Sequence, residues 1–491
     1  MPSRDLPRGS RWTDATPKLD PSHPIAQAID AFNRAVFHTI SFAGVEVELI
    51  VLWMFLPMVF LTVRFGFINV RGFGLAVRIL RGDFRSDRAP GDVTQAQALS
   101  TALSGTVGLG NIAGVAVAIS LGGPGAAFWM LCIGALAMTL KFTECTLGVK
   151  YRRVHEDGSI SGGPMYYLQA GLERRGWPRF GATLAWTYAV CAIPSMLQVA
   201  QVNQAYSQLS RVTGVDGLGW RWGFGIVLAL AVAFVILGGI RSIARVTSRL
   251  VPVMAGVYLG AALVVLGTHA TEVPRAVQVI VGDALAPEAG VGAVIGAFVW
   301  GMRRAVYSTE AGIGSATMAH AAAKTWEPVS EGLVALLEPF IDTVVICSAT
   351  ALVIVVTGAH TQGDVSDIQM TSSAFNAVLP GFDAVLALAV LLFAYSTIVS
   401  WAYYASKVWT FVFGDSAFSV TVYRIVFCCA LVPGAVLTTG QVFDIMDSLF
   451  FLMAVPNVLG LYLMAGEVRR DLSSYLERVR TREVPSRRVR P

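Results

Sequence analysis

The sequence predicts an all-α polytopic membrane protein with eleven transmembrane helices. Of the 491 residues, 55% are hydrophobic and only 14% are charged, whereas a soluble globular protein has about 25% charged residues. The mean hydropathy is +0.61, and apolar stretches long enough to cross a bilayer recur along the whole chain. These observations argue against a soluble enzyme of several domains.

The apolar stretches are the predicted spans. A bilayer core requires about 20 mostly apolar residues for each helix. Stretches that meet this requirement lie near residues 46–69, 97–121, 125–149, 183–209, 222–239, 250–268, 291–319, 333–357, 384–406, 422–438 and 447–465.

Arginine and lysine are distributed unevenly among the connections between these spans. They are frequent in every second connection and nearly missing from the others. The rich connections are 64–95, 150–182, 239–250 and the tail after 466, whereas 121–125, 358–383 and 438–447 have none and 270–291 has only Arg275. The positive-inside bias predicts a multi-pass protein of the plasma (inner) membrane with a cytoplasmic C-terminus. With eleven spans, the N-terminus is then outside.

The two ends of the chain differ in character. Residues 1–44 are predicted to be an extracytoplasmic segment without the apolar core of a signal peptide, and 45–70 to be an additional transmembrane helix. Within 24–44, apolar residues recur at helical spacing, which indicates either an amphipathic helix on the outer surface or a solvated lead-in. The arginine-rich residues 466–491 are predicted to be a basic cytoplasmic tail that contacts anionic lipid rather than nucleic acid.

The cysteine and histidine patterns do not indicate an enzyme. The six cysteines lie in apolar stretches without C-x-x-C spacing, so we expect them to be small buried hydrophobic residues rather than metal or redox sites. The six histidines are scattered, and neither H-E-x-x-H nor G-x-x-x-x-G-K-[ST] occurs. We therefore expect no catalytic residues and no organic cofactor.

Two spans contain glycine pairs that would interrupt a helix. Gly108-Leu109-Gly110 lies in the second span, and Gly312-Ile313-Gly314 lies in the seventh. Four further spans follow each break, so 97–268 and 291–465 are predicted to form two five-helix repeats. Because five is odd, the second repeat enters the membrane with opposite polarity. Inverted repeats that contain broken helices are typical of secondary transporters, and the breaks mark the binding site.

The breaks have a physical reason to line a site. A glycine costs ~1 kcal/mol in a helix interior, and unsatisfied backbone in hydrocarbon costs several kcal/mol, so an unwound segment survives only where it is buried or lines a cavity. Half-helix N-termini there attract a carboxylate, and freed carbonyls suit a hard cation such as Na⁺. An amino acid and a sodium ion fit such a site. The alternative is that the glycines, for example Gly110 and Gly114, only permit close helix packing.

Several motifs follow one another between about residues 45 and 466. The longest is GTVGLGNIAGVAVAISLGGPGAAFWM (105–130). The others are KFTECTLGVKYR (141–152), GGPMYYLQAGL (162–172), GGIRSIARVTSRLVP (238–252), STEAGIGSATMAHAAAKT (308–325), FIDTVVIC (340–347), FAYSTIVSWAYYASK (393–407) and MAVPNVLGL (453–461). In this order they resemble the alanine-or-glycine:cation symporters, a family of sodium-coupled amino-acid carriers. The resemblance implies a LeuT-like core of ten helices, here spans 2–11, preceded by one extra helix.

Three positions depart from the family pattern. Leu109 stands where many members have Thr in GTGN, and Thr309 replaces the Asn of SNEAG. Gln198 lies near the position of a family Asn, while Gln201 and Asn203 resemble the family's Gln-x-Asn. Since Leu109 and Thr309 both lie in the breaks, these departures bear on which amino acid is carried.

The resemblance implies a substrate site at the two breaks. The expected contacts are Gly108, Leu109, Gly110, Asn111, Gln201, Ser308, Thr309, Gly312 and Trp401. Asn111 would either donate to the substrate carboxylate or cap the second half-helix. Gln201 would contact substrate or form a hydrogen bond between helices. Trp401 would form a wall of the side-chain pocket or pack as an ordinary aromatic residue.

The resemblance also implies a sodium site beside the first break. Ser396 and Thr397 are adjacent hydroxyl residues in span 384–406, the eighth core helix, which faces the first broken helix in LeuT-like carriers. Carbonyl groups around Val107 and Gly110 would complete the oxygen shell. The alternative is that both hydroxyls bond back to their own helix.

Charged residues inside the spans have structural and functional interpretations. Lys141 and Glu144 are three residues apart and are expected to pair. Glu310 lies in the second break, and we expect it to accept hydrogen bonds from freed N–H groups, although an intramembrane acid is also a functional candidate.

Two further pairs leave alternatives open. Glu338 and Asp342 are neighbours four residues apart, and Glu338 departs from the family pattern, which leaves a proton-linked variation possible. Arg303 and Arg304 are expected to lie near a gate or to pair with an acid.

The favoured function is Na⁺-coupled symport, in the uptake direction, of a small neutral amino acid, alanine and/or glycine, by alternating access. The main alternatives are H⁺ coupling or a different amino acid. A channel is less favoured, because it would require rings of like polar residues and symmetry between chains. The expected partners are the amino acid and membrane lipid, with no nucleic acid.

Overall fold

The computed structural model describes residues 23–42, 45–84, 88–156, 158–285, 291–361, 368–437, 440–481 and 483. The first half of the expected extracytoplasmic segment (1–22) and the end of the basic tail (484–491) lie outside the described residues.

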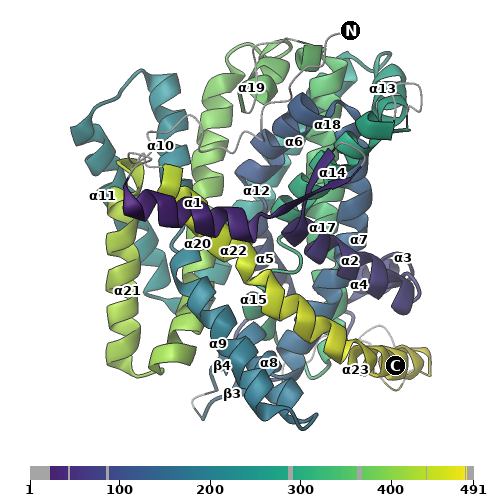
Figure 1. Ribbon diagram of the computed structural model, residues 1–491, viewed down its shortest axis with the longest axis vertical. Helices are drawn as coiled ribbons and strands as arrows, with labels where there is room; N and C mark the ends of the chain where they lie inside the picture. The colour runs from purple at the N-terminus through teal and green to yellow at the C-terminus, as the bar shows by residue number, and fades with distance from the viewer. Residues whose placement is uncertain are drawn as a thin grey trace.

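The described chain is almost entirely helical (Figure 1). Its first part contains α1 (Pro24–Val36), α2 (Leu49–Arg64), α3 (Ile68–Arg71), α4 (Phe73–Leu80), α5 (Gln95–Thr106), α6 (Leu109–Gly122), α7 (Gly125–Lys150), α8 (Pro164–Glu173), α9 (Pro178–Ser195), α10 (Val199–Thr213), α11 (Leu218–Ile236), α12 (Gly239–Thr268) and α13 (Val273–Leu285). Its second part contains α14 (Val291–Thr309), α15 (Thr317–Ala321), α16 (Pro328–Ala335), α17 (Leu337–Pro339), the π-helix η2 (Phe340–Cys347), α18 (Ser348–Val356), α19 (Ile368–Asn376), α20 (Phe382–Phe413), α21 (Ala417–Leu431), α22 (Gly440–Leu452) and α23 (Ala454–Arg480), with short 3₁₀ turns at η3 (Ala359–Thr361) and η4 (Val432–Ala435).

Two short antiparallel hairpins accompany the helices. In the first, β1 (Thr39–Phe42) pairs with β2 (Val45–Glu48), with Thr39 opposite Glu48. In the second, β3 (Arg153–Val154) pairs with β4 (Ile160–Ser161). Neither hairpin adds a sheet layer to the helical bundle.

Within the described residues, eight helical segments are long and apolar enough to cross a membrane, or nine if the bent pair α5 and α6 counts as one span. A helix or a pair of helices lies at each expected stretch, but the number eleven is not confirmed. Two expected spans account for the difference: α2 has only 16 residues, fewer than the about 20 of a straight crossing, and the seventh is divided between α14 and α15, with Arg303 and Arg304 in α14.

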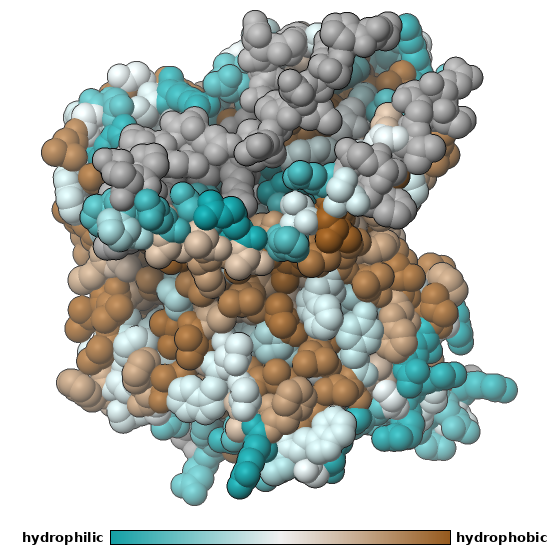
Figure 2. Space-filling model, in the orientation of Figure 1, coloured by the Kyte–Doolittle hydropathy of each residue, from teal (hydrophilic) through white to brown (hydrophobic). Residues whose placement is uncertain are grey.

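The surface fits a membrane protein. Figure 2 shows hydrophobic side chains gathered across the middle of the visible face and hydrophilic ones toward its two ends. Large apolar side chains on α11 and α12 are among the most exposed, including Phe234 at 84% and Leu263 at 69%. Such broad apolar exposure would be costly in water and is stable against lipid chains.

Residues 24–36 were expected to form either an amphipathic helix or a solvated lead-in, and they form the helix α1. This helix packs against α22 (Figure 1), and Ala26 and Asn33 on its inner side are buried. The solvated lead-in is therefore wrong for this segment.

The cysteine prediction is correct only in part. Cys145, Cys191 and Cys347 are buried, and Cys132 and Cys428 are half-buried. Cys429 is exposed, because α21 turns this position away from the helices it packs against.

Contacts between the broken helices position the site. The helix α5 packs against α12 and α20, while α6 packs against α14. The long helix α7 packs against α14, α16 and α2. The two glycine breaks therefore lie within one bundle, with α20 beside the first.

Candidate functional site

The first break separates α5 from α6. A capping box starts α5: the N–H of Gln97 donates to Oγ1 of Thr94, and the Thr94 N–H donates to Oε1 of Gln97. The helix ends at Thr106, and α6 begins at Leu109. The freed N–H of Gly108 donates to Oδ1 of Asn111 over 2.8 Å.

The second break lies between α14 and α15. Glu310, Gly312 and Gly314 all have positive φ angles, at 50°, 95° and 82°. Side chains rarely adopt this conformation, which explains the two glycines and makes Glu310 an exception. Three left-handed residues within five positions cannot continue an α-helix, so α14 stops at Thr309.

A cavity of about 350 Å³ lies beside both breaks. Its walls come from α5, α6, α10, α14, α20 and α22. Its lining residues include Gly105, Thr106, Gly108, Gly110, Gln198, Gln201, Gln208, Arg211, Arg304, Tyr307, Glu310, Thr397, Trp401, Asp447 and Phe450.

Of the predicted site residues, the structure brings five to this cavity: Gly108, Gly110, Gln201, Thr397 and Trp401. The others, Asn111, Ser308, Thr309, Gly312, Val107 and Ser396, are not among its described lining residues. The side chain of Leu109 lies outside the described part of the chain.

Trp401 is fixed against the first break. Its Nε1 donates to the carbonyl of Gly105 over 3.3 Å, and only 1% of the residue is exposed. Its ring packs edge-on against Tyr404 and at a tilt against Phe450. These contacts hold the indole rigidly as part of the cavity wall.

Thr397 joins α20 to α5. Its Oγ1 donates to the carbonyl of Ser104 over 3.0 Å, and Oγ of Ser104 donates to the carbonyl of Ser396 over 2.8 Å. A Cβ atom placed on Gly108 would lie 3.6 Å from Oγ1 of Thr397. Ser396 bonds back to Phe393 within its own helix, as the structural alternative predicted. The helix α20 thus faces the first break.

Asn111 is buried behind the first break. Besides capping α6, its Nδ2 donates to Oδ1 of Asp342 over 2.6 Å and to Oγ of Ser308 over 3.2 Å. Asp342 also accepts from Ser308 and Thr343 through Oδ2. No basic side chain pairs with Asp342 in the part of the chain that the structure describes. This cluster connects α6, α14 and η2. The hydrogen bond from Gly108 to Asn111 shows that Asn111 caps α6, as one of its two expected roles required.

Thr309 and Gly312 have local roles at the second break. Oγ1 of Thr309 donates to the carbonyl of Ala305 and accepts from the N–H of Ala311. Gly312 faces Met54, Leu140 and Val458 rather than the cavity.

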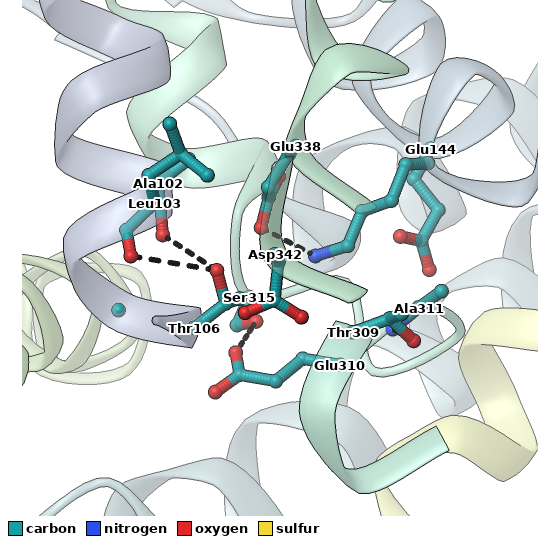
Figure 3. Close-up of polar contacts among 12 residues, drawn as sticks. Ala102, Leu103, Thr106, Glu144, Thr309, Glu310, Ala311, Ser315, Glu338 and Asp342 are labelled. Carbon is teal, nitrogen blue, oxygen red and sulfur yellow. Dashed lines mark hydrogen bonds and ion pairs between the residues drawn. The ribbon is translucent and has the colours of Figure 1, made fainter. Parts of the chain in front are cut away.

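Two expectations about buried charges are wrong. Lys141 pairs with Glu338 over 3.1 Å rather than with Glu144. Glu144 is instead engaged by the second break: its Oε1 accepts from the N–H of Gly312 over 2.9 Å and from Nδ2 of Asn457 over 2.7 Å. Since Glu144 satisfies the freed backbone, Glu310 does not perform that role. Glu310 accepts from Ser315 over 2.8 Å (Figure 3) and lines the cavity.

The two arginines before the second break, Arg303 and Arg304, have different surroundings. Arg303 pairs with Glu48 over 3.3 Å, which confirms the acid-pairing alternative for this residue. Arg304 is buried and lines the cavity next to Tyr307.

Sequence reasoning missed a third break and much of the polar wall. Gln198, between α9 and α10, has a φ of 55° and lines the cavity. Gln198 was noted only as a departure from the family pattern. The signals for a break were Pro194, four residues earlier, and the recurring amide side chains from Gln198 to Gln208.

The cavity reaches the surface at one end, where exposed Arg211 and Asp447 contribute to its lining. At the far ends of the broken helices, the segment before α5 pairs with the segment after α15. The N–H of Asp92 donates to the carbonyl of Ala322, and the N–H of Lys324 donates to the carbonyl of Val93, both over 2.8 Å.

Arg152 reinforces this pairing. Its guanidinium donates to the carbonyls of Ala321 and Ala323 over 2.7 Å, of Pro90 over 2.9 Å and of Thr325 over 2.6 Å. Four charge-assisted hydrogen bonds to two backbone segments form a clamp. We name Pro90–Val93, Ala321–Thr325 and Arg152 together the latch.

Known proteins resemble this chain over most of its length. Residues 30–489 match the model of the sodium:alanine symporter family. The sodium/alanine symporter AgcS of Methanococcus maripaludis is 38% identical over 426 residues, covering 85% of this chain and 92% of AgcS. The amino-acid carrier protein AlsT of Bacillus subtilis is 34% identical, covering 85% of this chain and 87% of AlsT.

Solved structures show the same fold. MhsT, solved in complex with L-phenylalanine, aligns with a TM-score of 0.52 at 13% identity over 76% of this chain and 88% of MhsT. A Na⁺-coupled sialic acid symporter aligns with a TM-score of 0.52 at 14% identity over 84% of this chain and 86% of its own. The fold is that of LeuT-like transporters and not of an enzyme, and the chain belongs to the sodium:alanine symporter family.

Proposed function

We propose that the protein imports a small neutral amino acid, alanine and/or glycine, together with Na⁺ by alternating access. The observation that carries this proposal is the cavity lined by Gly108 and Gly110 of the first break, by Glu310 of the second break and by Trp401. The relative AgcS is named a sodium/alanine symporter, which supports the same substrate class.

The ends of the broken helices suit an amino acid's charged groups. Gly108 and Gly110, at the start of α6, line the cavity, and a helix N-terminus carries about half a positive charge that attracts a carboxylate. The C-terminal end of α5 and the acid Glu310 provide the opposite polarity for an ammonium group. Trp401 limits the space for the side chain. Gln201 is a further candidate contact, and Asn111 and Ser308 would hold the break behind the substrate.

The proposed sodium site lies where α20 meets the first break. The hydroxyl of Thr397 and the carbonyls of Val107 and Gly110 are oxygen donors without a fixed charge, which a hard monovalent cation accepts. The hydroxyl of Ser396 would join them by turning away from Phe393. Closeness of Thr397 to Ser104 and Gly108 supports this location.

The proposed topology assigns 97–268 and 291–465 to two inverted repeats, with an external N-terminus and a cytoplasmic C-terminus. The open end of the cavity then faces outside, and the latch closes the cytoplasmic end. Movement of the two broken helices apart at the latch would open the other side, as alternating access requires.

Uptake into proteoliposomes tests the proposal. Radiolabelled alanine and glycine would be offered with an inward Na⁺ gradient, with equal Na⁺ on both sides, and with an inward H⁺ gradient. We expect concentrative uptake with the Na⁺ gradient alone. Glutamine is a suitable competitor, because one relative is named a probable sodium/glutamine symporter. Concentration driven by H⁺ without Na⁺ would contradict the coupling ion, and inhibition by glutamine but not alanine would contradict the substrate.

A further inference from the structure

A second cavity, of about 500 Å³, lies where the ends of α2, α7 and α8 meet α23. Four arginines line it: Arg64, Arg174, Arg175 and Arg470. Tyr462 and Leu463 of α23 form part of the same lining. The cavity is thus strongly basic with an apolar edge, and it is separate from the cavity at the glycine breaks.

Among the described residues, the acid in this cavity, Glu467, pairs with only one of the four arginines. Glu467 lies 2.7 Å from Nζ of Lys150 and accepts from the hydroxyl of Tyr151 over 2.7 Å. Its contact with Arg175 is longer, at 3.7 Å. Among the described residues, Arg64, Arg174 and Arg470 form no ion pair. Positive charge therefore remains for an anion from outside the chain.

Arg64 is held in place, and no acidic side chain among the described residues pairs with it. Its guanidinium lies over the ring of Phe60, 5.6 Å from the centroid, and its Nε is buried with no hydrogen-bond partner in the described structure. A Cβ atom on Gly466 would lie 3.4 Å from Nη2 of Arg64, so the glycine leaves room for the guanidinium. A buried unsatisfied donor destabilises the folded state, and a bound anion that accepts from it would relieve this cost.

The surface next to the arginines is apolar. On α2, Val59 is 36% exposed, Phe60 39% and Val63 63%. The ring of Phe60 also packs against Tyr462, with centroids 5.1 Å apart. A ligand that fills the cavity and continues along this surface carries an anionic head and an apolar body.

We propose that this cavity binds an anionic phospholipid. The phosphodiester lies among Arg64, Arg174 and Arg470, and an acyl chain lies along Val59, Phe60 and Val63. Arginine forks match phosphate oxygens in pairs, and basic pockets between transmembrane helices are known to hold anionic headgroups. This site concerns the lipid environment and does not depend on which amino acid or ion is transported.

Native mass spectrometry of the detergent-purified full chain tests the proposal. The protein would be titrated with phosphatidylglycerol, with phosphatidylcholine, and with phosphatidylglycerol in the presence of inorganic phosphate. We expect the wild type to retain phosphatidylglycerol over phosphatidylcholine. Each substitution Arg64→Gln, Arg174→Gln or Arg470→Gln should reduce the preference about fivefold, since each basic residue near an anionic headgroup contributes about that factor.

Matched controls separate the cavity from general charge. Arg245→Gln and Arg249→Gln remove exposed arginines of α12 from the same predicted side, and they should leave the preference unchanged. Arg174 and Arg470 are exposed, so their variants test the site even if Arg64→Gln does not fold. The proposal is overturned by equal retention of both lipids in the wild type, by equal losses in the cavity and control variants, or by displacement of the lipid by inorganic phosphate.

Discussion

Nζ of Lys141 in α7 lies 3.1 Å from Oε1 of Glu338 in α17, and both side chains are almost wholly buried. Removing one partner of such a pair leaves an uncompensated buried charge, which costs about 3–5 kcal/mol. We expect Glu338→Gln or Lys141→Met alone to lower the unfolding temperature strongly, as measured by tryptophan fluorescence on heating in detergent. The double variant should be more stable than either single variant. A double variant as unstable as the sum of the two would contradict a pairwise interaction.

The pairing of Lys141 with Glu338 shows the limit of predictions from sequence spacing. Lys141 and Glu144 lie on one face of a helix, and local spacing favours their pairing. It could not indicate that the N–H of Gly312, freed by the second break, would engage Glu144. The partner of Lys141 comes from a residue 197 positions away. Competition between a local partner and a distant backbone group is decided by packing, which one sequence does not contain.

The positions of the breaks could be predicted better than the residues around them. Glycine pairs are costly in a helix, so Gly108-Gly110 and Gly312-Gly314 were visible as interruptions. The break at Gln198 could not be predicted in this way, because nothing in the amino-acid sequence shows that a glutamine will adopt a left-handed backbone conformation. Gln201 and Trp401 were predicted as contacts through the resemblance, which noted Gln198 only as a departure from the family pattern. Tyr307 and Phe450 reach the cavity through tertiary packing alone.

Labelling of single cysteines should reveal the orientation. Glu272, after α12, and Glu173, at the end of α8, are both exposed, and the arginine pattern places them on opposite sides. In a background in which the exposed Cys429 is replaced by serine, Glu272→Cys should react with an impermeant maleimide in intact cells. Glu173→Cys should react only after permeabilisation. The reverse pattern would invert the assignment of both termini.

The proposed sodium site predicts a selective change in Na⁺ dependence. Thr397→Val keeps the side-chain shape but removes the hydroxyl beside Ser104 and Gly108. If a net oxygen ligand contributes about 1.4 kcal/mol, the Na⁺ concentration for half-maximal uptake should rise about tenfold. Adding Ser396→Ala should raise it further, with little change in substrate affinity at saturating Na⁺.

A control for this effect lies in the same helix. Thr410 bonds back to Lys407 over 3.2 Å and is not among the described lining residues of the cavity, so Thr410→Val should behave as wild type. Thr397→Ser should recover most of the Na⁺ affinity. If the Na⁺ dependence of the double variant is unaltered, the ion binds elsewhere, and Glu310 becomes the next candidate.

Trp401 should determine the size of the accepted side chain. Replacing it by phenylalanine removes the hydrogen bond to Gly105 and part of the cavity wall while keeping an aromatic ring. Alanine uptake should then become weaker, and leucine or methionine should compete more effectively than in the wild type. Trp409→Phe is the matched control, because Trp409 lies in the same helix and donates to Ser419 outside the cavity. Unchanged competition profiles in Trp401→Phe would leave the indole with a packing role only.

The latch should control access to the end of the bundle opposite the open cavity. Arg152 donates to carbonyls of both segments that flank the broken helices, and Val93 beneath it is only 3% exposed. Arg152→Gln cannot bridge the four carbonyls, so the latch should open more often. We measure this by maleimide labelling of Val93→Cys in the background without Cys429. A loss of about 1.4 kcal/mol in the closed state corresponds to labelling about tenfold faster.

The neighbouring arginine provides the control for this experiment. Arg153 lies over the ring of Tyr166 and makes none of the clamp's hydrogen bonds, so Arg153→Gln should label Val93→Cys at the wild-type rate. Arg152→Lys keeps the charge without the planar fork and should give an intermediate rate. Na⁺ joins α20 to the first break in the proposed mechanism, so adding Na⁺ should slow labelling in the wild type. Equal labelling rates in Arg152→Gln and wild type would show that the clamp does not limit opening. The backbone hydrogen bonds from Asp92 to Ala322 and from Lys324 to Val93 would then hold this end closed by themselves.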